Sequence, residues 1–401
     1  VKPARHAYPT QFYIILGGLL VSTTGTSMIW PFLTIYVSEK LALPLTQVTS
    51  LLALNGAVAL FASFIAGPIT DRFGRKGIMV VGLAGSGISY FLLSQASTLA
   101  AFAILLTLRG FFQPLYRVGT NAMVTDLVEP DKRAEAFAWM RMSFNVGIAI
   151  GPAIGGFIAV SSYAIGFTIA AATLLLFSLV IAFFIKETMP SNDTPSPANI
   201  PRFGGYSTIL RDRTFLTFIL SFTLFKICST MLWVLLGVYA KQNYGVLESQ
   251  YGLISATNAL MVVLFQVSVT RITKRYPMLP VLATGAFIYA LGVGTIIAGD
   301  SFWDFWLSYV VVTIGELIIL PTANTFVADI APIDKRGRYL SFFALAQGTS
   351  SSVAPLLGGI LNDQIGPKAI WYGSSFIGIL GALGFAVMSS RQRKNKTAQS
   401  V

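Results

Sequence analysis

The hydrophobic positions of this chain fall into long, continuous runs that are separated by short polar segments. Each run has about the length that a helix needs to cross a bilayer, roughly 20 residues. The runs lack the alternation over about ten residues that is typical of membrane β-strands. We therefore predict twelve transmembrane helices, near residues 11–37, 48–70, 77–95, 99–125, 136–160, 165–186, 214–241, 250–270, 279–298, 303–328, 339–362 and 369–389.

The second half of the chain repeats the first at a constant offset of 203 residues. Asn121–Phe137 reads NAMVTDLVEPDKRAEAF, and Asn324–Leu340 reads NTFVADIAPIDKRGRYL. The same offset places Trp30 on Trp233. A period of half the chain is too long for a solenoid and indicates two copies of one design.

The segment between the two copies contains MPSNDTPSPANIPRFGG, a composition typical of a flexible connector. We predict a six-helix bundle over 1–190, a cytosolic linker over 191–213, and a second six-helix bundle with a basic cytosolic tail over 214–401. The fold class is then an all-α integral membrane protein with two pseudo-symmetric bundles. Halves with an even number of helices are expected to run parallel.

Composition supports a membrane protein. Charged residues make up 11% of the 401 positions, whereas soluble domains have about 25%. The formal net charge of +12 raises the possibility of a nucleic-acid partner, but 21 of the 28 Lys and Arg fall in segments on one side of the predicted membrane and only three in loops on the other. The positive-inside rule then places both termini in the cytoplasm of a multi-pass protein. The expected location is the plasma (inner) membrane, with the lipid bilayer and not nucleic acid as partner.

Neither an enzyme nor a metal protein is indicated. Cys228 is the single cysteine and His6 the single histidine, so no metal site or disulfide is predicted. The chain has no phosphate-binding G-x-x-x-x-G-K-[ST] loop and no nucleophile paired with a base. We expect no catalytic residues, no bound cofactor, a small-molecule substrate and a monomer.

Ionisable residues inside the predicted spans are the sharpest chemical signal. Glu316 is the single acid at mid-membrane depth, and the bases are Arg109, Arg117, Arg141 and Lys226. A charge at the bilayer centre costs about 2.5–3.5 kcal/mol even on the lenient insertion scale. Such residues are therefore expected to face a cavity, a partner or water. Arg141 lies near a helix end, where a purely structural role is equally consistent.

The fourth predicted helix carries a polar stripe. Arg109, Gln113 and Arg117 are spaced at i, i+4 and i+8, which places them on one face. The 203-residue offset carries Gln113 onto Glu316, so the two copies place a polar group at the same depth.

Three sequence signatures resemble those of a known family. Gly67–Met79, GPITDRFGRKGIM, resembles the signature between helices 2 and 3 of the major facilitator superfamily. Gly147–Gly156, GIAIGPAIGG, is similar to the helix-5 signature of its drug:proton antiporters. Gly25 with Pro31 fits the helix-1 pattern, although Thr34 stands where that pattern has a later Pro. The resemblance covers the chain and favours the twelve-helix drug-efflux branch.

For the first signature, the resemblance implies an intracellular latch that stabilises the outward-facing state. Asp71 would meet the start of the eleventh helix and a basic residue after the fourth, for which Arg133 is the candidate. A charged turn that only fixes topology is the alternative. Lys274 stands where Asp71 would repeat, so a latch would be asymmetric. The latch residues are Gly67, Asp71, Arg72, Gly74, Arg75, Lys76 and Arg133.

The second signature has glycines on one helix face. Gly147, Gly151 and Gly155 are spaced at i, i+4 and i+8, which allows a neighbouring backbone to approach closely. Pro152 is expected to bend the helix, and Gly156 completes the motif. The resemblance adds a bend or seal that hinders leak in an antiporter, whereas helix packing alone is the simpler interpretation.

The family packs its helices 1, 4, 7 and 10 around a central cavity, and the resemblance implies that these helices line the cavity here. Arg109 matches the Arg of the helix-4 signature, but Phe112 and Gln113 replace the residues that follow, which weakens a proton-handling role for it. Trp30 and Trp233 are interpreted equally as packing or as cavity-lining aromatics. The candidate cavity residues are Ser27, Met28, Trp30, Arg109, Gln113, Arg117, Lys226, Thr230, Trp233, Glu316 and Asn324.

We predict proton-coupled export of lipophilic or amphipathic compounds, a multidrug efflux antiporter that works by alternating access. Glu316, with Arg109, is the candidate for coupling, and the proton is the coupling ion. A fixed salt bridge between Glu316 and an arginine is the structural alternative. The excess of buried bases suits instead a facilitator or flippase for an organic anion, a sugar phosphate or a lipid headgroup. A receptor or scaffold is a third class, but such proteins usually have a soluble domain or long loops.

Overall fold

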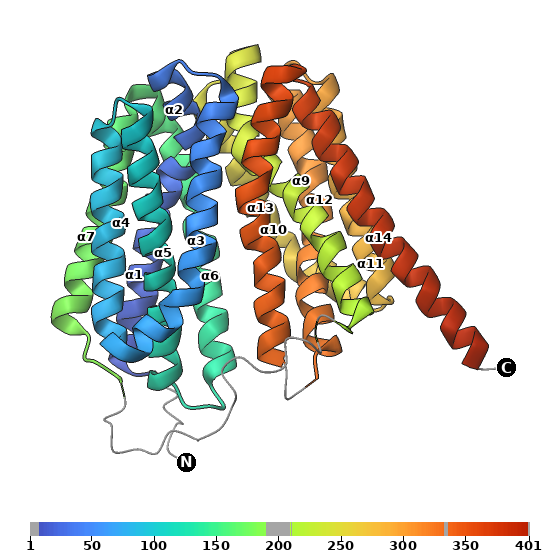
Figure 1. Cartoon of the computed structure of the whole chain (residues 1–401), viewed down its shortest axis with the longest axis horizontal. Coiled ribbons are helices and arrows are strands. Elements are labelled where there is room, and N and C mark those ends of the chain that lie inside the picture. Colours follow the sequence, from blue (N-terminus) through green and yellow to red (C-terminus); the bar gives the residue numbers. More distant parts are fainter. Residues whose placement is uncertain (1–7, 190–208, 210, 333–335, 400–401) are drawn as a thin grey trace. The chain divides into compact units, whose positions relative to one another are not determined.

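In a computed structural model the described residues, 8–189, 209, 211–332 and 336–399, form helices joined by short turns (Figure 1). The all-α prediction is confirmed for these residues, and eleven of their helices are long and apolar enough to cross a membrane. Most of the predicted linker, 191–213, lies outside the described residues. The helices of the first half are α1 (Thr10–Ile29), η1 (Trp30–Phe32), α2 (Leu33–Leu41), α3 (Leu45–Phe73), α4 (Arg75–Gln95), α5 (Leu99–Leu127), α6 (Arg133–Ser161) and α7 (Tyr163–Phe184).

In the second half, helix α9 begins and ends at residues that satisfy its terminal backbone groups. Asp212 caps α9 by accepting from the Phe215 N–H, and Gly245 ends that helix with a left-handed φ of +69°. The helices are α9 (Arg213–Tyr244), α10 (Glu248–Thr273), α11 (Met278–Thr295), η2 (Ile296–Ala298), α12 (Phe302–Ile330), α13 (Arg336–Gln364) and α14 (Ala369–Gln399).

The predicted eleventh span differs from the others in composition. Helix α13 has 29 residues, which is long enough to cross, but it is not among the eleven helices that combine length with apolar composition. Its middle carries the run Gly348–Ser352, GTSSS, and its last turn carries Asn362 and Asp363. Serine and threonine in a helix can return their hydroxyls to the preceding turn, and Ser350 does so to the Ala346 carbonyl at 2.7 Å.

The first predicted span is a broken helix. Its regular α-helical bonding stops at Ile29, a short 3₁₀ turn follows over Trp30–Phe32, and α2 resumes at Leu33. Pro31 lies in this turn and has no N–H to donate, which explains why the break occurs there.

The chain forms two compact units, and the division does not follow the midpoint of the sequence alone. The first unit contains the chain up to Tyr36 and from Ala57 through α7. The second contains Val37–Gly56 together with the chain from α9 onward. The end of α2, from Val37, and the beginning of α3, up to Gly56, therefore pack with the second unit.

Corresponding helices make corresponding contacts within each unit. In the first, α1 packs on α6 and α7, and α4 packs on α5 and α7. In the second, α9 packs on α13 and α14, and α11 packs on α12 and α14. These pairs are the ones that the 203-residue offset relates.

Within the second unit, a carboxylate anchors the beginning of α3. Asp363 accepts hydrogen bonds from the backbone N–H of Leu45 at 3.2 Å and of Thr46 at 2.7 Å. A negative charge at a helix N-terminus satisfies free N–H groups and favours the helix dipole. Lys241 of α9 adds an ion pair to Glu39 at the end of α2. These contacts explain why Val37–Gly56 belongs to the second unit.

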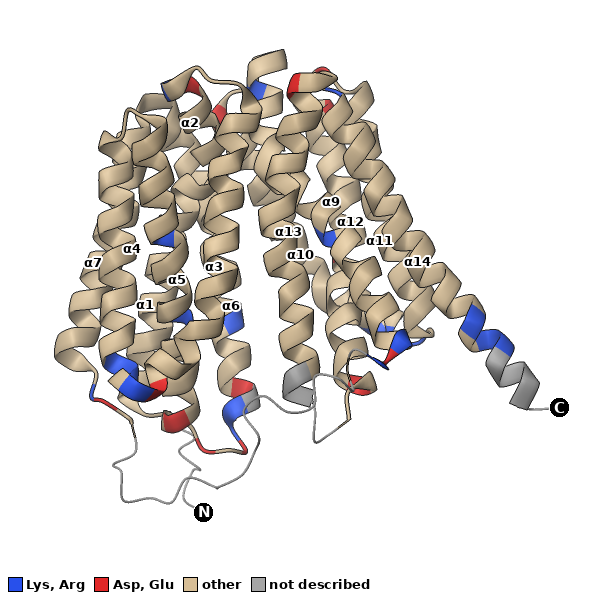
Figure 2. Ribbon diagram, viewed as in Figure 1, with Lys and Arg blue, Asp and Glu red and all other residues tan. Residues whose placement is uncertain are grey.

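Charged residues gather at the ends of the helices, and few lie along their middles (Figure 2). This distribution is expected for helices that are surrounded by lipid, because a charge at mid-depth must find water or a partner. The few charged side chains at mid-depth are therefore the natural starting point for a functional site.

Candidate functional site

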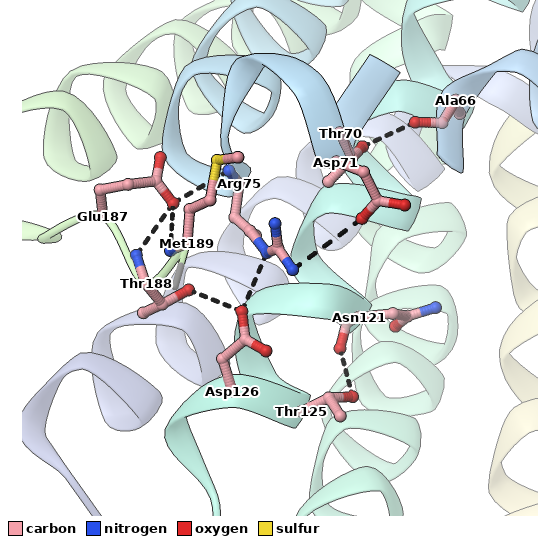
Figure 3. A network of polar contacts seen from close by, with 10 residues as sticks. All are labelled: Ala66, Thr70, Asp71, Arg75, Asn121, Thr125, Asp126, Glu187, Thr188 and Met189. Carbon is pink, nitrogen blue, oxygen red and sulfur yellow. Dashed lines mark hydrogen bonds and ion pairs between the residues drawn. The ribbon is translucent and has the colours of Figure 1, made fainter. Parts of the chain in front are cut away.

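The turn between α3 and α4 holds a network of charged groups (Figure 3). Arg75 donates from Nε to the Asp126 carboxylate of α5 at 2.9 Å. Its guanidinium also lies 3.9 Å from the Asp71 carboxylate, which is mostly exposed. Asp126 accepts a further hydrogen bond from the Thr188 hydroxyl at 3.1 Å. One arginine thus joins the ends of α3, α5 and the segment after α7.

Glu187 caps α4 from a distant part of the chain (Figure 3). Its carboxylate accepts from the backbone N–H groups of Arg75 and Lys76, both at 3.0 Å, at the start of α4. Two more backbone donors come from the residues that follow it, Thr188 and Met189. Burial alone raises the pKa of the Glu187 carboxyl, but the four backbone N–H groups outweigh burial and hold the pKa below its usual value.

Gly74 makes this cap possible. Its φ is +87°, a conformation that favours glycine, and a Cβ at this position would lie 2.5 Å from the Glu187 Oε2. Any larger residue would strain the turn and displace the carboxylate.

The remaining latch candidates have different surroundings. The pairing of Asp71 is with Arg75, whereas Arg133 donates from Nε to the Val128 carbonyl at 3.1 Å. Arg72 is exposed and stacks over the Phe73 ring at 5.4 Å, and the Cβ position of Gly67 faces open space. The predicted contact of Asp71 with the start of the eleventh helix stays a prediction.

The glycines of α6 lie directly against α1. A Cβ at Gly147 would come within 2.8 Å of the Thr23 Cβ. A Cβ at Gly151 would overlap Ser27, and one at Gly155 would overlap the Met28 carbonyl oxygen. The close approach that the i, i+4, i+8 spacing predicts is therefore present.

Two further members of the motif are buried, and two cavity candidates lie on the face of α1 that meets the glycines. Pro152 lies inside α6 and is buried, as is Gly156. Met28 is buried and Ser27 half-buried in the α1 face that meets these glycines.

Arg109 of α5 is enclosed by aromatic rings. Its side chain is buried, with the guanidinium carbon 3.9 Å from the Trp30 ring centroid. Its Nε donates to the Tyr90 hydroxyl of α4 at 3.0 Å. An arginine stacked on an aromatic face is stabilised by the ring quadrupole. The other members of the α5 stripe, Gln113 and Arg117, are exposed, and Arg117 donates to the Ser63 hydroxyl at 3.4 Å.

Glu316 of α12 lies in a polar cluster within the second unit. Its Oε2 accepts a hydrogen bond from the Asn258 amide of α10 at 2.9 Å. Lys226 of α9 lies close enough for an attractive Coulomb interaction with the carboxylate. Glu316 and Lys226 are both half-buried. A carboxylate that has one amide donor and one nearby cation can bind either a proton or a cationic group.

The other predicted cavity residues of the second unit differ in how exposed their side chains are. Thr230 and Trp233 on α9 are half-buried. Asn324 on α12 is exposed, and its amide returns to the Leu320 carbonyl at 2.8 Å. Nothing in these contacts groups Asn324 with Glu316.

Sequence reasoning missed four residues that carry these contacts, Tyr90, Asp126, Glu187 and Asn258. Asp126 could have been found, because the 203-residue offset carries it onto Asp329. Glu187 follows a predicted span and reads as an ordinary charged end. An asparagine or tyrosine inside an apolar run gives no signal that separates a partner of a charge from a packing residue.

Comparison with known proteins identifies the family. The sequence matches the family description of the Major Facilitator Superfamily over residues 15–234 and again over 224–400. The chain belongs to the major facilitator superfamily. The resemblance inferred from the signatures is confirmed, and this protein is a membrane transporter and not an enzyme.

Curated relatives of this facilitator share about a quarter of its residues over nearly the whole chain. A Na⁺, Li⁺, K⁺/H⁺ antiporter of Planococcus maritimus is 27% identical, with 93% of this chain and 92% of the relative covered. Multidrug resistance protein 1 of Bacillus subtilis is 24% identical, with 87% and 89% covered.

Among solved structures, a POT family transporter in complex with a thioalcohol-conjugated peptide has a similar fold. The TM-score is 0.80 at 18% identity, over 96% of this chain and 97% of that one. At this identity the likeness concerns the fold alone.

Proposed function

We propose that this facilitator is a proton-coupled secondary transporter that exports lipophilic or amphipathic compounds by alternating access. The observation that carries the proposal is the Glu316 carboxylate, which lies in the α12 span with the Asn258 amide and the Lys226 ammonium around it. Within the spans of the described residues, no other Asp or Glu lies at this depth.

The proposed cycle follows from the chemistry of a carboxylate. As an anion, Glu316 attracts the cationic group of an amphipathic substrate, and as a neutral acid it no longer does. Substrate and proton then compete for one group. When the site is open to the outside, a proton from that side binds the carboxylate and releases the substrate. The proton leaves when the site is open to the inside, and the next substrate binds there.

This proposal includes the finer architecture. We infer twelve spans with α13 as the eleventh, two bundles related by pseudo-symmetry, and both termini in the cytoplasm of a plasma membrane. We also infer that the network of Asp71, Arg75, Asp126 and Glu187 is a latch for the outward-facing state. A turn that only fixes topology is the competing explanation, and the Glu187 variant discussed below separates the two.

The relatives support coupling to protons. One is an antiporter that exchanges alkali cations for H⁺, and another is a multidrug resistance protein. An exchange of a cation for H⁺ suits a group that binds a proton and a cation in turn, which is the role proposed for Glu316.

Replacing the carboxyl tests the proposal. We expect Glu316→Gln to lose accumulation of a lipophilic cationic dye in proteoliposomes under an imposed pH gradient. Glutamine keeps the shape and accepts the Asn258 hydrogen bond but cannot bind a proton. Glu129→Gln is the matched control, because Glu129 is exposed and its ion pair among the described residues is with Lys132 of the same turn. Undiminished proton-driven accumulation by Glu316→Gln would remove Glu316 as the coupling group.

An anionic substrate is a second candidate, because the spans contain more bases than acids. Arg117 is the base that best suits this role, since it is exposed and its hydrogen bond to Ser63 is long, at 3.4 Å. Arg109, by contrast, is enclosed by Trp30 and Tyr90. Proteoliposomes loaded with an organic anion and with a cationic dye separate the two. Saturable anion flux that Arg117→Gln abolishes, without dye transport, would favour the second candidate.

A further inference from the structure

The Asn258 side-chain amide donates two hydrogen bonds from one nitrogen, and their arrangement is fixed. The side chain is 7% exposed, and its Nδ2 donates to the Glu316 Oε2 and to the Thr313 Oγ1, both at 2.9 Å. Thr313 and Glu316 lie three residues apart on α12, so both face α10 from neighbouring turns.

Thr313 determines which way the amide points. Its hydroxyl donates to the Tyr309 carbonyl at 2.8 Å, one turn earlier in α12. The hydrogen of the hydroxyl is then committed, and its lone pairs are left to accept. The Asn258 side chain therefore presents its NH₂ and not its carbonyl to this face, with one hydrogen for Thr313 and the other for Glu316.

We propose that Asn258, oriented by Thr313, is a positioning residue that sets the pH at which Glu316 exchanges its proton. A donor that cannot turn away stabilises the carboxylate more than the neutral acid, because hydrogen bonds to an ionised acceptor are the stronger ones. When Glu316 gains a proton, the Asn258 amide still presents its two N–H hydrogens and cannot accept the new carboxyl O–H. That O–H must find another acceptor. This inference rests on the proposed function and names the residues that adjust the pH at which Glu316 exchanges its proton.

Other groups that act on Glu316 come from each helix packed beside it. Lys226 of α9 attracts the carboxylate, and Tyr289 of α11 and Tyr309 of α12 interact with it electrostatically. The tyrosines are neutral at ordinary pH. Lys226 is thus the charged neighbour, and Asn258 is the neutral donor.

Helix α13 also packs on α12, and two of the titratable side chains described for it have other partners. The Tyr339 hydroxyl donates to Asp212, and Asp363 accepts from the N-terminus of α3. A substitution of Asn258 or Thr313 therefore changes the hydrogen bonding of Glu316 and leaves its charged neighbour, Lys226, in place.

The pH dependence of proton-driven dye transport in proteoliposomes tests the proposal. Asn258→Leu keeps most of the volume and removes the donor, and it is expected to move the pH of half-maximal transport upward by about one unit. Thr313→Val leaves Asn258 in place but frees its amide to turn, so a smaller shift in the same direction is expected. Thr313→Ser retains the hydroxyl and should restore the wild-type midpoint.

Gln266→Ala is the matched control. Gln266 also joins α10 to α12, because its amide donates to the Leu317 backbone carbonyl at 3.1 Å and not to the Glu316 carboxylate. A purely structural role for Asn258 would lower the transport rate of both variants and leave both midpoints at the wild-type pH. That result would overturn the inference.

The outcomes also distinguish this inference from the function on which it rests. Full proton-driven transport by Glu316→Gln contradicts the proposed function. Loss of transport in Glu316→Gln, together with a wild-type midpoint in Asn258→Leu, contradicts only the role of Asn258. If Asn258→Leu is not recovered as a monodisperse protein, the comparison of Thr313→Val with Thr313→Ser decides, and equal midpoints in these two variants contradict the inference.

Discussion

At the scale of single residues, the two ionisable groups singled out for coupling differ in what surrounds them. Arg109 is buried between Trp30 and Tyr90 and is held there by a cation–π contact and a hydrogen bond. An arginine remains protonated at all relevant pH values, so it can attract but not carry a proton. Glu316 has a donor and a cation beside it and can exist in either form. The surroundings therefore favour Glu316 as the titrating group, and the contacts of Arg109 join α5 to η1 and α4. A coupling role for either residue stays a prediction.

The cap by Glu187 should make the stability of the protein depend on pH. The backbone donors hold its pKa below the unfolded value, which is about 4.3. The carboxylate thus contributes stability above that pH and loses the contribution as pH falls through the lower, folded value. Because the residue is exposed, we expect Glu187→Gln to lose less than about 1 kcal/mol at neutral pH, or about 1–3 °C in melting temperature.

Thermal melting of the detergent-solubilised protein at several pH values measures this. The difference between wild type and Glu187→Gln should shrink as the pH falls below 4 to 5, whereas Glu129→Gln should show little difference at any pH. A gap that stays constant with pH would mean that the cap does not depend on charge. If the network is a latch, Glu187→Gln also lowers the transport rate, and a turn that only fixes topology predicts an unchanged rate.

At the scale of helices, α1 and α6 approach each other closely along the glycine face of α6. The three glycines of α6 that face α1 leave no room for a methyl group. In lipid, where helices gain little from burying apolar surface, such close packing supplies much of the attraction between them. Ser143 adds a hydrogen bond to the Leu16 carbonyl at 3.0 Å.

A single added methyl group should therefore separate this pair. Gly155→Ala places a Cβ against the Met28 carbonyl oxygen, and overpacking of this kind costs about 1–3 kcal/mol. We expect a lower melting temperature and slower transport. Gly17→Ala, on α1 where nothing lies within 4 Å of the added Cβ, is the control and should be neutral or slightly stabilising. Equal melting temperatures for the two variants would contradict the proposed role of the glycine face.

Sequence could predict the helices and the glycine face because both depend on local patterns. An apolar run of spanning length has few alternatives to a helix, and i, i+4 spacing fixes a face. The break at Trp30–Phe32 was harder, since Pro31 inside an apolar run can equally produce a gentle kink. Asn258 could not be identified, because its role depends on α10 meeting α12, which no spacing within α10 encodes.

At the scale of the whole molecule, the repeat describes packing better than chemistry. The same helix pairs meet in each unit, as expected if the 203-residue offset relates two copies of one design. The polar groups do not repeat in the same way. The first unit has the network around Arg75, whereas Lys274 stands in the second unit where the first has Asp71. Gln113 stands in the first unit where the second has Glu316.

The boundary between the two units also differs from the boundary between the repeats, since Val37–Gly56 belongs to the second unit. Contacts between distant segments, such as that of Asp363 with α3, decide this division, and sequence periodicity does not report them.

The number of spans makes a prediction for the whole molecule that depends on α13. If this helix crosses the membrane, Lys368, which follows it, lies on the side opposite to Lys132 and Lys274. If the helix does not cross, Lys368 lies on the same side as those two lysines. We expect Lys368→Cys, in a Cys228→Ser background, to react with a membrane-impermeant maleimide in intact cells. Lys132→Cys and Lys274→Cys should react only after permeabilisation, because the positive-inside rule places their basic turns in the cytoplasm. Cys228 is buried, so its replacement by serine removes the one competing thiol with little change in volume. Protection of the cysteine at position 368 together with those at 132 and 274 would mean that α13 does not cross, and the polar run Gly348–Ser352 would then have to lie outside the hydrocarbon core.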